Sequence, residues 1–151
     1  MEQQLDSLYE LLSELKPREI RAFNGLYHQL LLESYRWELR GAAYILGEGM
    51  CSDDSFDYFR SWLISMGREV YERALQDPDS LVEIAGQPGI EDIYFEEFAY
   101  VAAEVYTEKT GKDIPDPEVF FPPVPAGEEW LEEPGELSKL YPRLWAKYGW
   151  A

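Results

Sequence analysis

Apolar residues recur along this chain mainly every three or four positions, which is the spacing of one face of an α-helix. The first fifteen residues repeat leucine in this way. Helical spacing continues from Arg18 to Leu46 and leaves open one helix or two helices broken near Ser34. β-branched residues are sparse, and strict alternation of apolar and polar residues is nowhere sustained. The pattern therefore predicts an all-α protein.

A helix over about residues 53–66 has the clearest start signal. Ser52 can cap it by accepting a hydrogen bond from a free backbone N–H, and Asp53 and Asp54 follow where carboxylates complement the helix dipole. At 100° per residue its apolar residues fall on one broad side: Phe56, Phe59, Trp62, Leu63 and Met66. Residues 35–46 are apolar nearly all round, which is typical of a buried helix. We expect these two helices at the centre of the fold.

Two glycines lie inside helical patterns and have different expected roles. Gly25 would cost about 1 kcal/mol relative to alanine in a helix interior. Gly41 is followed by Ala42 and Ala43 and would let another helix approach closely.

The second half of the chain alternates helical patterns with breaks. A short helix is expected after Asp77-Pro78, and an amphipathic helix over 92–109, ended by Gly111. Residues 112–135 hold six of the ten prolines and predict an extended strap. We expect this strap to wrap the helices and bury Phe120, Phe121, Val124 and Trp130; the alternative is a polyproline strip that binds a partner. Residues 136–149 predict a C-terminal helical segment that Pro142 divides.

The length and composition favour a single domain, residues 1–151, of about six or seven helices. A single cysteine excludes an internal disulfide. No apolar stretch approaches the ~20 residues of a membrane span, and no basic region follows Met1 as in a signal peptide. These features predict a cytoplasmic protein without a membrane partner.

The charge is strongly asymmetric. The net charge is −17, from 30 acidic and 13 basic residues, and residues 74–138 hold seventeen acids with only Lys109 and Lys112. Direct binding to nucleic acid is excluded because a basic footprint is absent. The acidity is either a solvated face that maintains solubility or a docking surface for a basic protein partner.

Candidate chemistry is sparse. One cysteine and one histidine cannot supply a structural zinc site. Cys51 paired with His28 would be a weak nucleophile, because Asp53 and Asp54 oppose a thiolate. Magnesium or calcium on Asp53, Asp54 and Asp57 is an alternative, although the spacing does not match a calcium loop. The sequence therefore predicts no catalytic residue, no metal site and no cofactor.

One polar stripe runs along the helix that begins after Ser52. Asp57 and Arg60 are three residues apart, and Ile64 within the stripe indicates that it is partly covered. The first interpretation is an ion pair on a core helix. The alternative is a small polar site with tryptophan walls, formed by Asp53, Asp54, Asp57, Arg60, Trp37 and Trp62.

Three motifs are similar to those of a bacterial family. They are W-x-L-x-G-A-A from Trp37, C-S-D-D-x-F-x-x-F-R-x-W-L-I from Cys51, and D-P-D-S-L from Asp77. Over residues 35–81 the chain resembles the domain-of-unknown-function family 4240, with Arg40 where that family is expected to have tryptophan. The resemblance implies a bacterial, cytoplasmic origin, and it implies no activity.

Three functional hypotheses follow. The first is a non-catalytic acidic interaction or accessory protein that binds a basic partner. The second is a small enzyme or ligand-binding protein that uses the polar stripe. The third is a toxin-neutralising or nucleic-acid-mimicking protein, with the carboxylates of residues 91–136 in rows near phosphate spacing.

Overall fold

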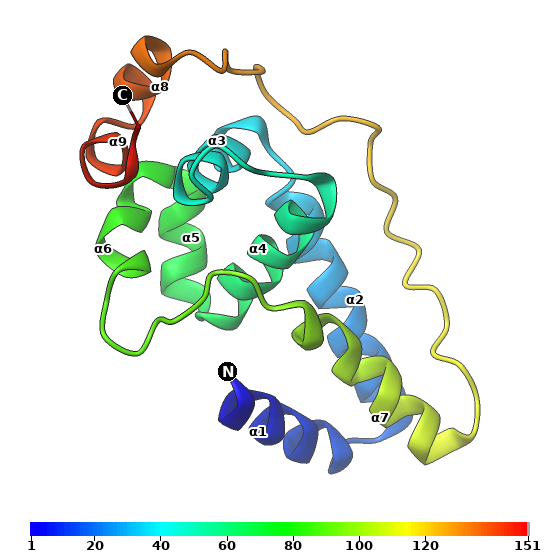
Figure 1. Cartoon of the computed structure of the whole chain (residues 1–151). Helices are drawn as coiled ribbons and strands as arrows, with labels where there is room; N and C mark the ends of the chain where they lie inside the picture. The colour runs from blue at the N-terminus through cyan, green and yellow to red at the C-terminus, as the bar shows by residue number, and fades with distance from the viewer. Residues whose placement is uncertain (151) are drawn as a thin grey trace.

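Helices provide all the regular secondary structure in residues 1–150, the part of the chain that the computed structural model describes. The all-α prediction is confirmed. These residues form nine α-helices, so the expected six or seven is too low. In chain order (Figure 1) the elements are α1 (Glu2–Ser13), α2 (Pro17–Glu33), α3 (Trp37–Leu46), α4 (Asp53–Ser65), α5 (Arg68–Gln76), η1 (Pro78–Leu81), α6 (Val82–Ala85), η2 (Glu96–Tyr100), α7 (Val101–Thr110), α8 (Pro134–Leu140) and α9 (Pro142–Tyr148).

Two predicted segments each divide into two helices. The region from Arg18 to Leu46 breaks after Ser34, where Arg36 is extended with φ −135° and ψ 143°. The extended backbone there pairs with a distant segment: Ala126 donates to the Tyr35 carbonyl at 2.9 Å, and Trp37 donates to the Ala126 carbonyl at 2.9 Å. The C-terminal segment breaks before Pro142, which begins α9 as its sequence predicts.

The helix predicted over 92–109 begins later than expected. Phe95 is not helical, with φ −135° and ψ 69°, because its N–H donates to the Tyr58 carbonyl at 3.0 Å and its ring is fully buried. A 3-10 turn, η2, then leads into α7. The predicted end is confirmed, because Gly111 adopts the left-handed conformation with φ 72°.

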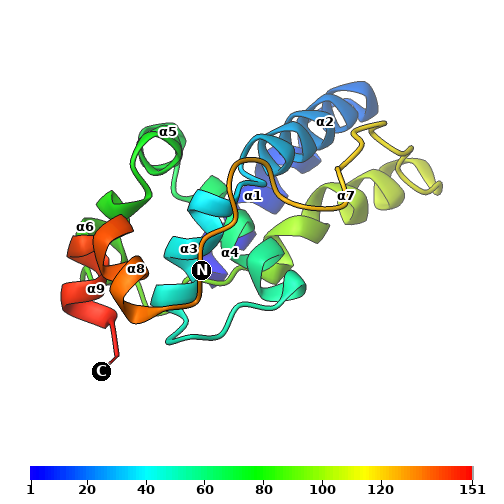
Figure 2. The ribbon, with the colours of Figure 1, turned by 90° about the horizontal axis from the view of Figure 1, so that it is seen from above.

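The main core forms around α3 and α4. The predicted cap of α4 is confirmed, because the Ser52 hydroxyl accepts a hydrogen bond from Ser55 N–H at 3.1 Å. Buried side chains of these two helices include Leu39, Ala42, Ala43, Ile45, Phe56, Phe59, Trp62 and Leu63. A second, smaller cluster joins α1, α2 and α7, which lie together at one end of the molecule (Figure 2).

The C-terminal helices pack against α3 and η1 through specific polar contacts. The Tyr141 hydroxyl donates to the Glu38 carbonyl at 2.6 Å, directly beside Gly41. The carboxylate of Asp79, 7% exposed, accepts from the N–H groups of Arg143 at 3.1 Å and Leu144 at 2.8 Å, at the first turn of α9. A close approach is present at Gly41, but it is made by the side chain of Tyr141, between α8 and α9, and not by a helix as expected.

The segment between α7 and α8, residues 111–133, contains no helix and runs along the outside of α2 toward α3 (Figure 1). We call it the strap. We expected four apolar side chains of the strap to be buried, and this prediction is wrong for three of them. Phe120, Phe121 and Val124 are 82%, 41% and 58% exposed. Only Trp130 is half-buried. Other contacts hold the strap: the backbone of Ala126, the indole of Trp130, the buried Pro125, and Ile114, which packs against the second cluster. Within residues 1–150, no helix is long and apolar enough to cross a membrane.

Candidate functional site

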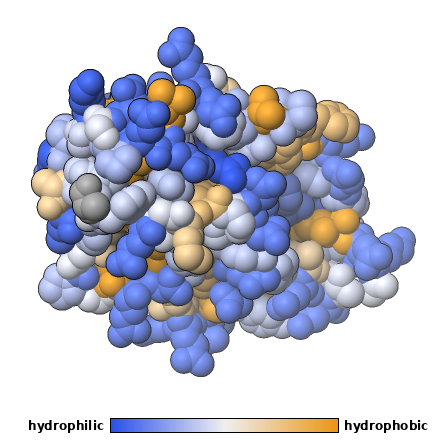
Figure 3. Space-filling view, turned by 45° about the horizontal axis from the view of Figure 1, so that its top comes forward, coloured by the Kyte–Doolittle hydropathy of each residue, from blue (hydrophilic) through white to orange (hydrophobic). Residues whose placement is uncertain are grey.

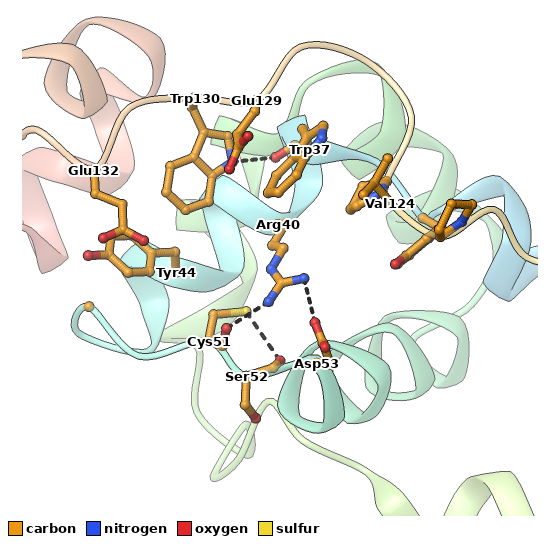
Figure 4. A pocket seen from close by; sticks show the side chains of 14 residues that line it. Trp37, Arg40, Tyr44, Cys51, Ser52, Asp53, Val124, Glu129, Trp130 and Glu132 are labelled. Carbon is orange, nitrogen blue, oxygen red and sulfur yellow. Dashed lines mark hydrogen bonds and ion pairs between the residues drawn. The ribbon is translucent and has the colours of Figure 1, made fainter.

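The strap roofs a cavity of about 600 Å³ over α3 (Figure 4). We call it the strap cavity. Its walls come from α3, the loop before α4, the first residue of α4, and the strap itself. The cavity is lined by Tyr35, Trp37, Arg40, Tyr44, Gly49, Cys51, Ser52, Asp53, Pro123, Val124, Pro125, Glu129, Trp130 and Glu132.

Aromatic rings form much of this cavity. Trp130 Nε1 donates to the Trp37 carbonyl at 2.6 Å, which fixes the indole against α3. The Trp130 ring centroid lies 6.2 Å from that of Trp37, nearly perpendicular, and 5.0 Å from that of Tyr44. The row continues outside the cavity through Trp150, 5.4 Å from Tyr44, and Trp145, 4.8 Å further. All but one of the five tryptophans therefore lie along the surface of α3.

Arg40 occupies the floor of the strap cavity and joins α3 to the start of α4. Its guanidinium donates to Asp53 Oδ1 at 2.9 Å and to the Cys51 carbonyl at 3.0 Å (Figure 4). The guanidinium carbon also lies 5.8 Å from the Trp37 ring centroid and 5.5 Å from that of Phe56. Such stacking is typical of arginine on aromatic faces. Two of its hydrogen-bond donors and two ring faces are thus engaged within the protein.

The ionisable groups give the strap cavity a negative balance. Three carboxylates, Asp53, Glu129 and Glu132, line it against the single cation Arg40. Burial, reinforced by the carboxylate of Glu132, raises the pKa of the Tyr44 hydroxyl. This electrostatic effect agrees with Figure 4, in which the Glu132 side chain lies beside the Tyr44 ring.

Cys51 also lines the cavity but is poorly suited to nucleophilic chemistry. Burial raises the pKa of its thiol, and this effect exceeds the opposing influence of Arg40. The thiolate is the reactive form of cysteine, so a raised pKa lowers its reactive fraction at neutral pH. Among residues 1–150, no group of three or more histidine, cysteine, aspartate and glutamate side chains is arranged to hold a metal ion.

A second cavity, of about 970 Å³, lies between α2, α4, α7 and the first part of the strap. Three residues, Tyr35, Arg40 and Asp53, line both cavities. The Arg40–Asp53 ion pair therefore marks the place where the two hollows meet. Asp54 and Asp57 line only the second one.

The predicted Asp57–Arg60 ion pair is present within α4, and Arg60 also links α4 to α2 through a hydrogen bond to the Leu31 carbonyl. The Arg60 side chain is 3% exposed, donates to the carbonyls of Leu31 and Phe56, and lies 4.9 Å from the Tyr35 ring centroid. Burial lowers the pKa of Arg60, and the neighbouring Asp57 carboxylate opposes that shift. Because its donors are used on backbone and on Asp57, Arg60 acts here as a tie between helices.

Comparison with protein families gives one match. A family model described as "Protein of unknown function (DUF4240)" matches residues 1–108. The chain belongs to this family. No curated protein and no solved structure matches it. The DUF4240 match ends within α7, so it includes α3 and the start of α4 but not the strap.

The strap cavity is thus built from both parts of the chain. Trp37, Arg40 and Asp53 lie within the DUF4240 match, whereas Glu129 and Trp130 lie beyond it. Placing these two groups together requires the strap to return to α3 after the family-matched region has ended.

The structure brings the four polar residues of the predicted site together at one cavity but not its two tryptophan walls. Trp37 and Asp53 line the strap cavity, and Asp53, Asp54, Asp57 and Arg60 line the second cavity. Trp62 is 2% exposed in the main core and lines neither. The sequence interpretation missed Tyr44, Glu129, Trp130 and Glu132, because no periodic signal links the strap to α3. The nearest signal was the apolar character of Trp130 in a proline-rich segment.

Proposed function

We propose that this protein is a non-catalytic binding protein whose acidic second half binds a basic segment of another protein. The observation that carries this proposal is that most carboxylates of the acidic second half belong to no ion pair. Residues 91–136 contain fourteen acidic side chains, and none belongs to an ion pair among the described residues. The ion pairs use Asp53, Asp57, Glu72 and Glu83 instead.

Exposure adds to this support. Thirteen of the fourteen carboxylates are exposed, on η2, α7, the strap and the loops beside them. The face in Figure 3 is largely hydrophilic, with separate apolar patches. Uncompensated charge of one sign attracts an oppositely charged partner over distances comparable to the Debye length, about 10 Å at 0.1 M salt. A basic segment would neutralise this charge.

Three polar groups with side chains suited to catalysis are engaged in other ways. Arg60 is buried against backbone carbonyls, and the pKa of Cys51 is raised by burial. His28 Nδ1 lies 2.8 Å from the Asn24 carbonyl, four residues before it. These contacts favour a binding protein over an enzyme.

Isothermal titration calorimetry of the full chain with a short lysine- and arginine-rich peptide tests the proposal. We expect binding that weakens between about 0.1 M and about 1 M salt, as the Debye length falls from about 10 Å to about 3 Å. An acidic peptide of the same length is the control and should not bind. The absence of binding at low salt, or binding that salt does not weaken, would contradict the proposal.

A second candidate function is favoured by the second cavity. Its volume of about 970 Å³ falls in the range of small-ligand pockets, and Asp54, Asp57 and Tyr58 line it. A thermal-shift screen of small polar molecules against the wild type and Asp54→Asn tests this role. Ligands that stabilise both proteins equally would not be using this carboxylate, and the polar-site hypothesis would fail for them.

A further inference from the structure

We infer that the strap cavity binds the guanidinium group of an arginine side chain from the basic partner, an inference that rests on the proposed function. The cavity combines aromatic faces, unpaired carboxylates and a volume of about 600 Å³. The aromatic rings and the carboxylates together point to a planar cation as the bound group.

Three of the aromatic rings that line the cavity pack against one another at defined angles. Trp130 and Trp37 stand at 88° to each other, and Tyr44 is tilted by 36° from Trp130. The hydrogen bond from Trp130 Nε1 to the Trp37 carbonyl holds this arrangement. A cation within about 6 Å of such a ring is attracted to its face, most strongly for tryptophan.

The protein already seats one guanidinium on one of these rings, that of Trp37. Arg40 lies 5.8 Å from the Trp37 centroid, and its charge is balanced by Asp53 at 2.9 Å. Glu129 and Glu132 line the same cavity, and neither belongs to an ion pair. A second guanidinium would supply the cation that these two carboxylates lack.

Arginine fits this environment better than lysine for three reasons. Its guanidinium is planar and stacks on aromatic rings, it pairs with carboxylates through two parallel hydrogen bonds, and it is more weakly hydrated than an ammonium group. An anionic ligand is disfavoured, because Asp53, Glu129 and Glu132 outnumber Arg40.

The test compares three peptides of one sequence, rich in lysine, with arginine, lysine or citrulline at the central position. Arginine and lysine carry equal charge, so a charged surface alone would bind those two peptides equally. We expect the arginine peptide to bind the full chain about fivefold more tightly than the lysine peptide, with citrulline weakest, because paired charge-assisted hydrogen bonds are strong.

Two double variants locate the effect. Glu129→Gln with Glu132→Gln removes the two carboxylates of the strap cavity that belong to no ion pair, leaves Asp53 paired with Arg40, and should abolish the preference for arginine. Glu128→Gln with Glu133→Gln is the matched control, since it removes two exposed strap carboxylates that do not line this cavity. The control variant should bind the arginine and lysine peptides more weakly by the same factor, so that the preference for arginine remains. All four side chains are exposed, so neither variant is expected to disturb folding.

The outcomes separate this inference from the proposed function. If the arginine and lysine peptides bind the wild type equally, or if the control variant loses the preference as fully as the cavity variant, the strap cavity is not the arginine site. The acidic binding function would still stand in that case. If no peptide binds at low salt, the proposed function fails and takes this inference with it.

Discussion

Replacing Gly41 with alanine should destabilise the protein even though alanine is the better helix former. Gly41 lies in α3, and an added Cβ would be 2.2 Å from Tyr141 Oη and 2.6 Å from Tyr141 Cζ. Tyr141 is 4% exposed, and its hydroxyl donates to the Glu38 carbonyl at 2.6 Å. The ring therefore has to move out of a buried, hydrogen-bonded position.

Opposing contributions decide whether Gly41→Ala raises or lowers the free energy of unfolding. Alanine gains up to about 1 kcal/mol in helix propensity over glycine. Overpacking a core site costs about 1–3 kcal/mol, and losing the tyrosine hydrogen bond costs about 0.5–1.5 kcal/mol more. We therefore expect Gly41→Ala to lower the free energy of unfolding by about 1–3 kcal/mol.

Gly25 provides a matched control within the same protein. It lies inside α2, and a Cβ added there would meet no atom within 4 Å. Gly25→Ala should therefore raise the free energy of unfolding by about 0.5–1 kcal/mol. Urea denaturation followed by circular dichroism measures both variants. If both substitutions stabilise the protein, Tyr141 does not pack against Gly41 and the docking of α9 on α3 is incorrect.

Three further predictions test other contacts. Asp79→Ala should lower the free energy of unfolding by about 2–4 kcal/mol in urea denaturation, because two backbone N–H groups of α9 lose a buried carboxylate acceptor; a loss below about 0.5 kcal/mol would refute this capping role. Burial raises the pKa of Tyr71 from 10.0 to about 12, so the unfolded chain releases this proton first and stability should fall as pH rises through that interval. Tyr71→Phe should make this alkaline fall shallower, and an unchanged slope would contradict the assignment. Trp130→Phe removes the hydrogen bond to the Trp37 carbonyl and should speed hydrogen exchange at the Ala126 amide, whereas Phe120→Ser, at an 82% exposed side chain, should leave that exchange unchanged.

Local signals explain which parts of the fold could be predicted from the sequence. The start of α4 depends on Ser52 and the carboxylates that follow it, all within one turn, and the predicted cap is present. The end of α7 depends on one glycine, Gly111. The ion pair between Asp57 and Arg60 depends on a spacing of three residues along one helix. Each of these features is encoded by neighbouring residues.

Contacts between residues far apart in the sequence could not be predicted from such local signals. The helical pattern continues through residues 92–95, but a hydrogen bond from Phe95 N–H to the Tyr58 carbonyl prevents a helix there. The hydrogen bond between Trp130 and Trp37 joins residues 93 positions apart. Composition suggested equally that Phe120 and Trp130 would be buried, and only the path of the strap distinguishes them.

The position of the strap is determined by the fold at both of its ends, and this bears on how a partner would bind. Beyond the strap, Leu137 and Leu144 are fully buried in the main core, and Asp79 caps α9. A segment that is already ordered loses less conformational entropy on binding than a free tail does. The strap cavity therefore depends on α8 and α9 as well as on its own lining. A chain cut after Gly111 would lose Trp130 together with Glu129 and Glu132, and it would uncover the side of α3 that Tyr141 covers. Binding measurements on the family-matched region alone would thus test a different surface from the one proposed here.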